Sequence, residues 1–187
     1  MMGWLKVFFC VSSFIVNCVY ADAVDINKEI TAAIYSENYD SFSKAYKQVE
    51  NKDSIMLTEG YMKGVVVSYL FWTIDVKEPS FFDLVVEHSD PNIPDESGLT
   101  AIFIASFNCD LDKAQKLIAK GSNINFTLKG SGLTPLHSVA TSECYSLANL
   151  FLQHGADKKA TTNMDKLTPY DMAVKSGYSR MADILKL

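Results

Sequence analysis

The sequence predicts an all-α fold in which helix-turn-helix repeats stack into a solenoid. The first observation is a motif that returns at a fixed interval, since Thr100, Thr134 and Thr168 lie 34 residues apart. The second is apolar residues at helical spacing after each motif. The third is a glycine 21 residues after the first two threonines, at Gly121 and Gly155. A period of about 20–50 residues is typical of stacked repeats.

The recurring motif has the features of a helix start. It occupies residues 98–105, 132–139 and 166–173. Thr134 can cap the helix that Pro135 opens, because proline fits the first helical turn, where its missing N–H costs nothing. The closing glycines suit a helix end that adopts a left-handed conformation. Each unit is therefore predicted to contain two short helices and an exit turn.

These residues resemble the ankyrin-repeat family. The run Thr134-Pro135-Leu136-His137 matches the signature of that family, whose repeat has about 33 residues. Phe103 and Asp171 replace the signature histidine, and Ala101 replaces the proline. The resemblance implies a concave surface, made of turn tips and first-helix faces, on which partner proteins dock.

The repeats are expected to extend upstream with weaker sequence similarity. Residues 57–92 read as a degenerate repeat, with a first helix from Leu57 to Ile74, followed by repeats at 93–125, 126–159 and 160–187. Residues 24–56 read as a divergent N-terminal helical pair, Ile26 to Ser36 and Tyr39 to Val49. Divergent end units are expected because they cover an otherwise open core.

The first 23 residues have the pattern of a signal peptide. One lysine at Lys6 precedes a short apolar run over residues 7–16, and small residues follow at Ala21 and Ala23. We therefore expect an exported protein, in the bacterial periplasm or otherwise secreted, with no stable membrane insertion after cleavage. An uncleaved anchor and a lipoprotein attached through Cys18 are the alternatives.

Charge and cysteine content narrow the function classes. The net charge of −5 leaves no basic excess for phosphates, so nucleic acid is not an expected partner. Cys109 and Cys144 would remain after signal cleavage, and an oxidising compartment favours pairing them in a disulfide. Two separate buried thiols are the alternative.

The sequence shows no pattern of catalytic or metal-binding residues. Ser131 lies directly between Gly130 and Gly132, which is not the spacing of a nucleophile elbow. The chain lacks a phosphate-binding loop and the usual zinc patterns. Neither a cofactor nor a metal ion is expected. Asn125-Phe126-Thr127 is a formal glycosylation sequon.

The ankyrin resemblance places the candidate partner-binding residues on the turn tips and the first-helix faces. Exposed apolar side chains there would indicate an interface, although Ile104, Phe107 and Phe126 could instead pack under neighbouring loops. The tip residues are Asp95, Glu96, Phe126, Leu128, Lys129, Met164, Asp165 and Lys166, and the helix residues are Ile104, Phe107, Ser138, Thr141, Met172 and Lys175.

An exported ankyrin protein of this size resembles two kinds of bacterial protein. One is a non-enzymatic immunity protein that occludes a secreted antibacterial toxin, such as a phospholipase or other lipase effector of type VI secretion. The other is an accessory to catalase in oxidative stress. A third hypothesis is an enzyme with its site in the divergent region 25–80. We expect the immunity protein, because small size, acidity and lack of catalytic residues suit a stoichiometric inhibitor.

Overall fold

The computed structural model describes residues 26–49, 52–53, 55–57, 66–95 and 97–186. The predicted signal peptide, residues 1–23, and the tip residue Glu96 lie outside these ranges. Within them, no helix is long and apolar enough to span a bilayer.

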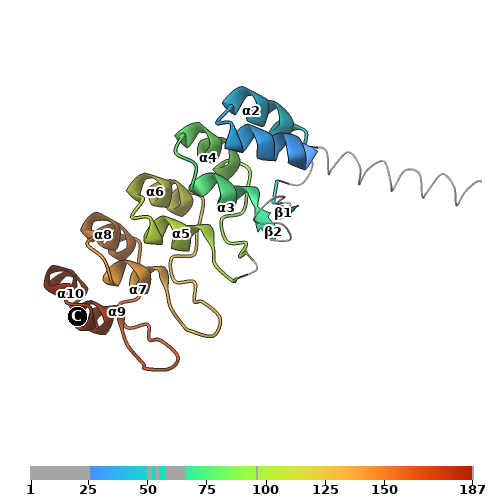
Figure 1. The fold of residues 1–187 in the computed structure, drawn as a ribbon. Helices are drawn as coiled ribbons and strands as arrows, with labels where there is room; N and C mark the ends of the chain where they lie inside the picture. Colours follow the sequence, from blue (N-terminus) through green and yellow to red (C-terminus); the bar gives the residue numbers. More distant parts are fainter. Residues whose placement is uncertain (1–25, 50–51, 54, 58–65, 96, 187) are drawn as a thin grey trace, which may run out of the picture.

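The predicted fold class is confirmed: helical pairs stack side by side along one axis (Figure 1). A helix over residues 26–35 opens the series. The remaining helices are α2 (Tyr39–Lys47), α3 (Tyr69–Ile74), α4 (Pro79–Val86), α5 (Ala101–Phe107), α6 (Leu111–Ala119), α7 (Pro135–Ala140), α8 (Tyr145–Gln153), α9 (Pro169–Lys175) and α10 (Ser179–Leu185). The odd-numbered helices from α3 to α9 are the first helices of their pairs, and each is followed by its even-numbered partner.

Side-chain caps explain where several helices begin. Thr134 accepts a hydrogen bond from the backbone N–H of His137, and the His137 ring accepts one from the N–H of Thr134. Thr168 and Asp171 form the same reciprocal pair at the start of α9. Each of these reciprocal pairs, known as a capping box, satisfies two backbone N–H donors that the helix itself leaves unpaired.

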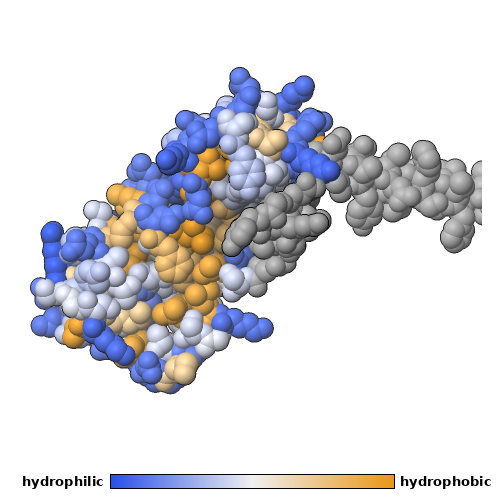
Figure 2. Space-filling view, viewed as in Figure 1, coloured by the Kyte–Doolittle hydropathy of each residue, from blue (hydrophilic) through white to orange (hydrophobic). Residues whose placement is uncertain are grey.

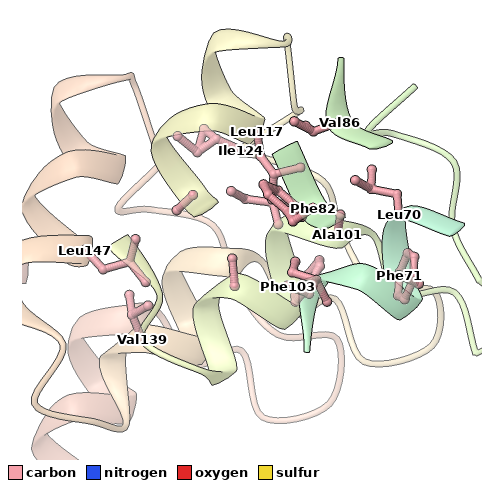
Figure 3. Packing of buried hydrophobic residues seen from close by; sticks show 14 of the residues in the cluster. Leu70, Phe71, Phe82, Val86, Ala101, Phe103, Leu117, Ile124, Val139 and Leu147 are labelled. Atoms are coloured by element: carbon pink, nitrogen blue, oxygen red, sulfur yellow. The ribbon is translucent and has the colours of Figure 1, made fainter. Parts of the chain in front are cut away.

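The core runs along the stack between the helices of successive pairs. Figure 3 shows Phe82, Phe103 and Leu117 among the residues that fill it. The side chains of Phe82, Phe103, Leu117 and Val139 are fully buried. Because each unit covers the apolar surface of the next, stability depends on neighbouring units staying in place.

The predicted helix from Leu57 to Ile74 is confirmed only over Tyr69–Ile74, and it is wrong at Leu57 and at Val66–Ser68; residues 58–65 lie outside the described ranges. Strand β1 (Ile55–Leu57) pairs antiparallel with strand β2 (Val66–Ser68), Ile55 opposite Ser68, and helix α3 begins only at Tyr69. Consecutive β-branched residues before Ser68 favour a strand, and the Ser68 hydroxyl then caps α3 by accepting the N–H of Phe71.

Long loops join successive pairs, and we call them finger 1 (residues 91–99), finger 2 (122–133) and finger 3 (156–167). They project from the same side of the stack (Figure 1). Asparagines tie each finger to the next: Asn125 donates to the carbonyl of Gly155 and accepts from the N–H of Asp157. Asn163 of finger 3 donates to the carbonyls of Ser131 and Gly130 at the tip of finger 2. The fingers are therefore held in fixed positions beside the first helices.

Candidate protein-binding face

Repeat register places two rows of side chains on the first helices. The first row lies four residues after the N-caps Ser68, Thr100, Thr134 and Thr168, and consists of Trp72, Ile104, Ser138 and Met172. The second row lies three residues before the N-caps of the second helices, and consists of Tyr35, Asp75, Phe107, Thr141 and Lys175. We call these rows and the three fingers the concave face.

An aromatic cluster lies at the centre of the concave face. The buried ring of Phe103 lies 6.4 Å from the ring of Phe107 and 6.3 Å from that of Phe126, between ring centroids. Phe126 is half-buried, whereas Phe107 keeps 56% of its surface exposed. The cluster joins α5 to finger 2, so Phe107 projects from a well-packed base. Figure 2 shows apolar surface gathered around α5.

The structure adds Tyr35 and Trp72 to the residues predicted for this face. Trp72 is half-buried and packs edge-on against Tyr35, with ring centroids 5.7 Å apart, while 67% of Tyr35 is exposed. Counting four residues after the N-cap Ser68 and three residues before the N-cap Asn38 would have found both residues. The predicted helix from Leu57 to Ile74 concealed Ser68 as an N-cap.

The predicted contact residues differ in how far they are exposed. Ile104, Phe126, Leu128 and Met172 are half-buried and pack against the core. Asp95 and Ser138 are also half-buried. The exposed members are Phe107, Lys129, Thr141, Met164, Asp165, Lys166 and Lys175.

Lysines surround the C-terminal half of the concave face. Lys129 lies on finger 2 and Lys166 on finger 3, and Asn163 joins the tips of these two fingers. Lys175 is the last residue of α9. Lys166 has a backbone φ of 53°, a left-handed conformation that the equivalent residues Gly98 and Gly132 adopt as glycines. A lysine in this conformation costs stability, and backbone strain of this kind concentrates at functional positions.

His137 has a structural role between two repeats. It is fully buried, and its Nε2 lies 3.1 Å from the carbonyl oxygen of Leu167, while Nδ1 accepts from the N–H of Thr134. These partners assign the neutral form with the proton on Nε2. Burial lowers the pKa of His137, although backbone hydrogen bonds to Leu167 and Ala160 oppose the shift. The imidazole is therefore part of the scaffold behind the face.

Cys109 and Cys144 are joined by a disulfide whose Cα atoms are 5.6 Å apart. It links the α5–α6 turn to the start of α8. Cys109, in that turn, comes two residues after Phe107 in the sequence. The bond therefore lies at the edge of the concave face.

A cavity of about 390 Å³ lies between the α3–α4 turn and α6, and Asp75 of the second row is one of the residues that line it. Two of the lysines that line it are engaged: Lys116 pairs with Asp83, and Lys113 donates to the carbonyls of Ile74 and Val76. In the part of the chain that the structure describes, no group of three acidic, histidine or cysteine residues could hold a metal ion.

Comparison with known proteins gives one family. The family described as "Ankyrin repeats (3 copies)" matches residues 70–162 and, in an overlapping alignment, 104–186. The mouse RelA-associated inhibitor is 34% identical over 103 residues, which are 54% of this chain and 12% of that protein. An ankyrin repeat protein of Rickettsia felis is 35% identical over 75 residues, 40% of this chain and 25% of that protein. The human 2-5A-dependent ribonuclease is 34% identical over 70 residues, 37% of this chain and 9% of that protein.

Proposed function

Since this chain belongs to the ankyrin-repeat family, we propose that it is a non-enzymatic protein-binding module whose partner docks on the concave face. The observation that carries this proposal is the exposed ring of Phe107, which stands on the buried Phe103 beside the half-buried Ile104. A large aromatic side chain on a rigid base is the kind of residue that dominates binding energy at interfaces, because little ordering entropy is lost when it is covered.

The finer proposal is an exported immunity protein that occludes a secreted antibacterial toxin, such as a phospholipase effector. The signal-peptide pattern at the N-terminus supports export. The tied fingers support a preorganised inhibitor, since rigid loops lower the entropic cost of binding. One protein that is similar to this chain over 103 residues is named as an inhibitor, the RelA-associated inhibitor of mouse. Occlusion of the active site requires only a stable complex, so no catalytic residue is needed.

The test is inhibition of a phospholipase encoded beside this protein's gene. We expect the full exported chain to inhibit the enzyme at equal molar amounts. Phe107→Glu is expected to raise the Kd about 30-fold or more, since a hot-spot residue contributes about 2 kcal/mol or more. Asn149→Glu is the matched control, because Asn149 is exposed on α8, a second helix outside the concave face. Titration calorimetry measures both variants.

Three outcomes contradict parts of the proposal. Equal weakening by both substitutions would remove the concave face as the docking site. Absence of inhibition, with a complex to a catalase instead, would replace the immunity role by the oxidative-stress role. Hydrolytic activity of the isolated chain would overturn its non-enzymatic character.

A further inference from the structure

Helix α8, like α10, begins without the side-chain cap that the second helices α2, α4 and α6 have. Its N-cap is Cys144, whose sulfur is bonded to Cys109 and accepts no hydrogen bond from the helix. At the same position in the pair, Asn38 caps α2 and Asp110 caps α6, each through a side-chain oxygen 3.0 Å from a backbone nitrogen. The free backbone N–H groups at the start of α8 are therefore available to an acceptor at residue 144.

The two sulfur atoms differ in accessibility. Cys109 is exposed in the α5–α6 turn, whereas the Cys144 side chain is buried, with 9% exposed. An attacking thiolate therefore reaches the sulfur of Cys109, and Cys144 is the leaving group. Exchange is faster when the leaving sulfur is a stable thiolate. A helix N-terminus stabilises a thiolate through its free N–H groups and its dipole.

We propose that the Cys109–Cys144 disulfide is a reversible thiol switch that a protein dithiol reduces. One thiolate of the dithiol attacks Sγ of Cys109, the Cys109–Cys144 bond breaks, and its electron pair passes to Cys144 as a thiolate that caps α8. The second thiol of the reductant then attacks the mixed disulfide and releases Cys109, which takes up a proton. Two electrons pass to this protein, and the reductant is oxidised to a disulfide.

Two influences on the Cys144 thiolate oppose each other: the free N–H groups at the start of α8 favour it, and burial beside the core disfavours it. The charged side chains on the neighbouring elements largely offset one another. Helix α8 packs against α6, α7 and α10. On α6, Lys113 lies 3.4 Å from the Asp110 carboxylate, so these charges offset each other. On α10, the Arg180 guanidinium stacks on the Tyr145 ring, 4.4 Å from its centroid. Its positive charge is opposite in sign to the carboxylate of Glu143, which precedes Cys144. On α7, His137 is held by Leu167. Glu143→Gln, which removes the negative charge next to Cys144, is therefore expected to favour the thiolate further.

The switch would regulate the concave face, because Cys109 lies two residues after Phe107. This consequence rests on the proposed function, whereas the thiol chemistry does not. Failure of the redox test would leave docking on Phe107 intact, and failure of docking would leave the thiol chemistry intact.

The first experiment uses single-cysteine variants of the exported full chain. Cys109→Ser leaves Cys144, and Cys144→Ser leaves Cys109 as the matched control in a turn. The pH of half-maximal alkylation by iodoacetamide is measured on folded protein, because this midpoint reports the thiolate fraction independently of access. The midpoint for Cys144 is expected at least about one pH unit below that for Cys109. An equal or higher midpoint would overturn the proposal.

The second experiment keeps both cysteines, so it holds even if a serine variant fails to fold. The chain is equilibrated with dithiothreitol at low ionic strength, alkylated and counted for trapped thiols by mass spectrometry, while circular dichroism reports helix content. Two thiols are expected to be trapped with the helical signal retained. Ser146, exposed in the first turn of α8, supplies opposite variants. Ser146→Lys is expected to raise the reduced-to-oxidised ratio several-fold, and Ser146→Glu to lower it. Reduction only after unfolding, or no difference between the variants, would refute the switch.

Discussion

At the scale of single residues, one replacement in the repeat signature leaves a hydroxyl unpaired. Thr134 Oγ1 lies 2.8 Å from the His137 ring nitrogen. In the preceding repeat Phe103 occupies the histidine position, and Thr100 Oγ1 is buried without a partner among the described residues. The phenylalanine gains the aromatic contact to Phe126 but removes the acceptor that the threonine would use.

This difference predicts that the same substitution costs more stability at Thr134 than at Thr100. Thr134→Val is expected to lower the free energy of unfolding by about 1–2 kcal/mol, because it removes a cap and the partner of His137. Thr100→Val is expected to change it by about 0.5 kcal/mol or less, since the lost hydroxyl makes no hydrogen bond. Urea unfolding of both variants, with the disulfide intact, measures the pair. Equal losses would mean that Thr100 has a hydrogen-bond partner in solution.

Burial of His137 predicts a loss of stability in mild acid. Its folded pKa lies below the ordinary value of 6.5, so the unfolded chain takes up the proton more readily. The contribution is fully present above about pH 6.5 and decreases as the pH falls toward the folded pKa, by at most about 1.4 kcal/mol per pH unit. Thermal melting between pH 7.5 and 5 measures it. His137→Phe is the control, because Phe103 shows that the stack accepts this ring; a wild-type slope equal to the control slope would contradict the assignment.

Asp171 predicts a second, separate decrease at lower pH. Its carboxylate accepts hydrogen bonds from the Thr168 hydroxyl and N–H, and these lower its pKa from the ordinary value of 3.8. The stability that it contributes is present above that value and is lost as the pH falls through the folded pKa. Asp171→Asn is expected to flatten this lower step while leaving the His137 step unchanged. A melting series between pH 5 and 2.5 separates the two.

At the scale of elements, the fingers repeat one turn with one exception. The equivalent residues Gly98, Gly132 and Lys166 all have positive φ. Lysine is less suited to this conformation than glycine is. Lys166→Gly is expected to stabilise the chain by about 0.5–1 kcal/mol in urea unfolding. Lys129→Gly on finger 2 is the matched control, expected to destabilise by a similar amount, since Lys129 has no positive φ. A stabilised chain that binds its partner more weakly would show that the lysine serves binding.

The elements also show how far sequence reasoning extends. The 34-residue interval of Thr100, Thr134 and Thr168 predicted the three C-terminal pairs, because caps and glycines act locally and leave readable signals. It failed at Leu57 and at residues 66–68, where apolar residues suit a helix or a strand alike and only pairing of β1 with β2 decides. Because the prediction did not identify Ser68 as the N-cap of α3, it also did not place Trp72 on the concave face. The half-burial of Ile104 and Phe126 depends on contacts between elements, which spacing does not determine.

At the scale of the whole molecule, a solenoid buries its inner units and leaves its last unit open. Leu136 and Ala140 of α7 are fully buried because α9 covers them. Their equivalents on α9, 34 residues later, are Tyr170 and Val174, which are 37% and 54% exposed. The same helix face is therefore core on α7 and exposed on α9, where the described residues leave Tyr170 and Val174 partly uncovered.

This difference predicts that one substitution is tolerated at the end of the stack and not inside it. Val174→Glu is expected to change the free energy of unfolding by about 0.5 kcal/mol or less, as exposed substitutions do. Ala140→Glu is expected to cost about 4 kcal/mol or more, because it places an unpaired carboxylate in a fully buried position. Urea unfolding at several protein concentrations measures both. If Val174→Glu proves as costly as Ala140→Glu, and the cost grows with concentration, a second copy covers the open end, since only an intermolecular contact makes stability depend on concentration.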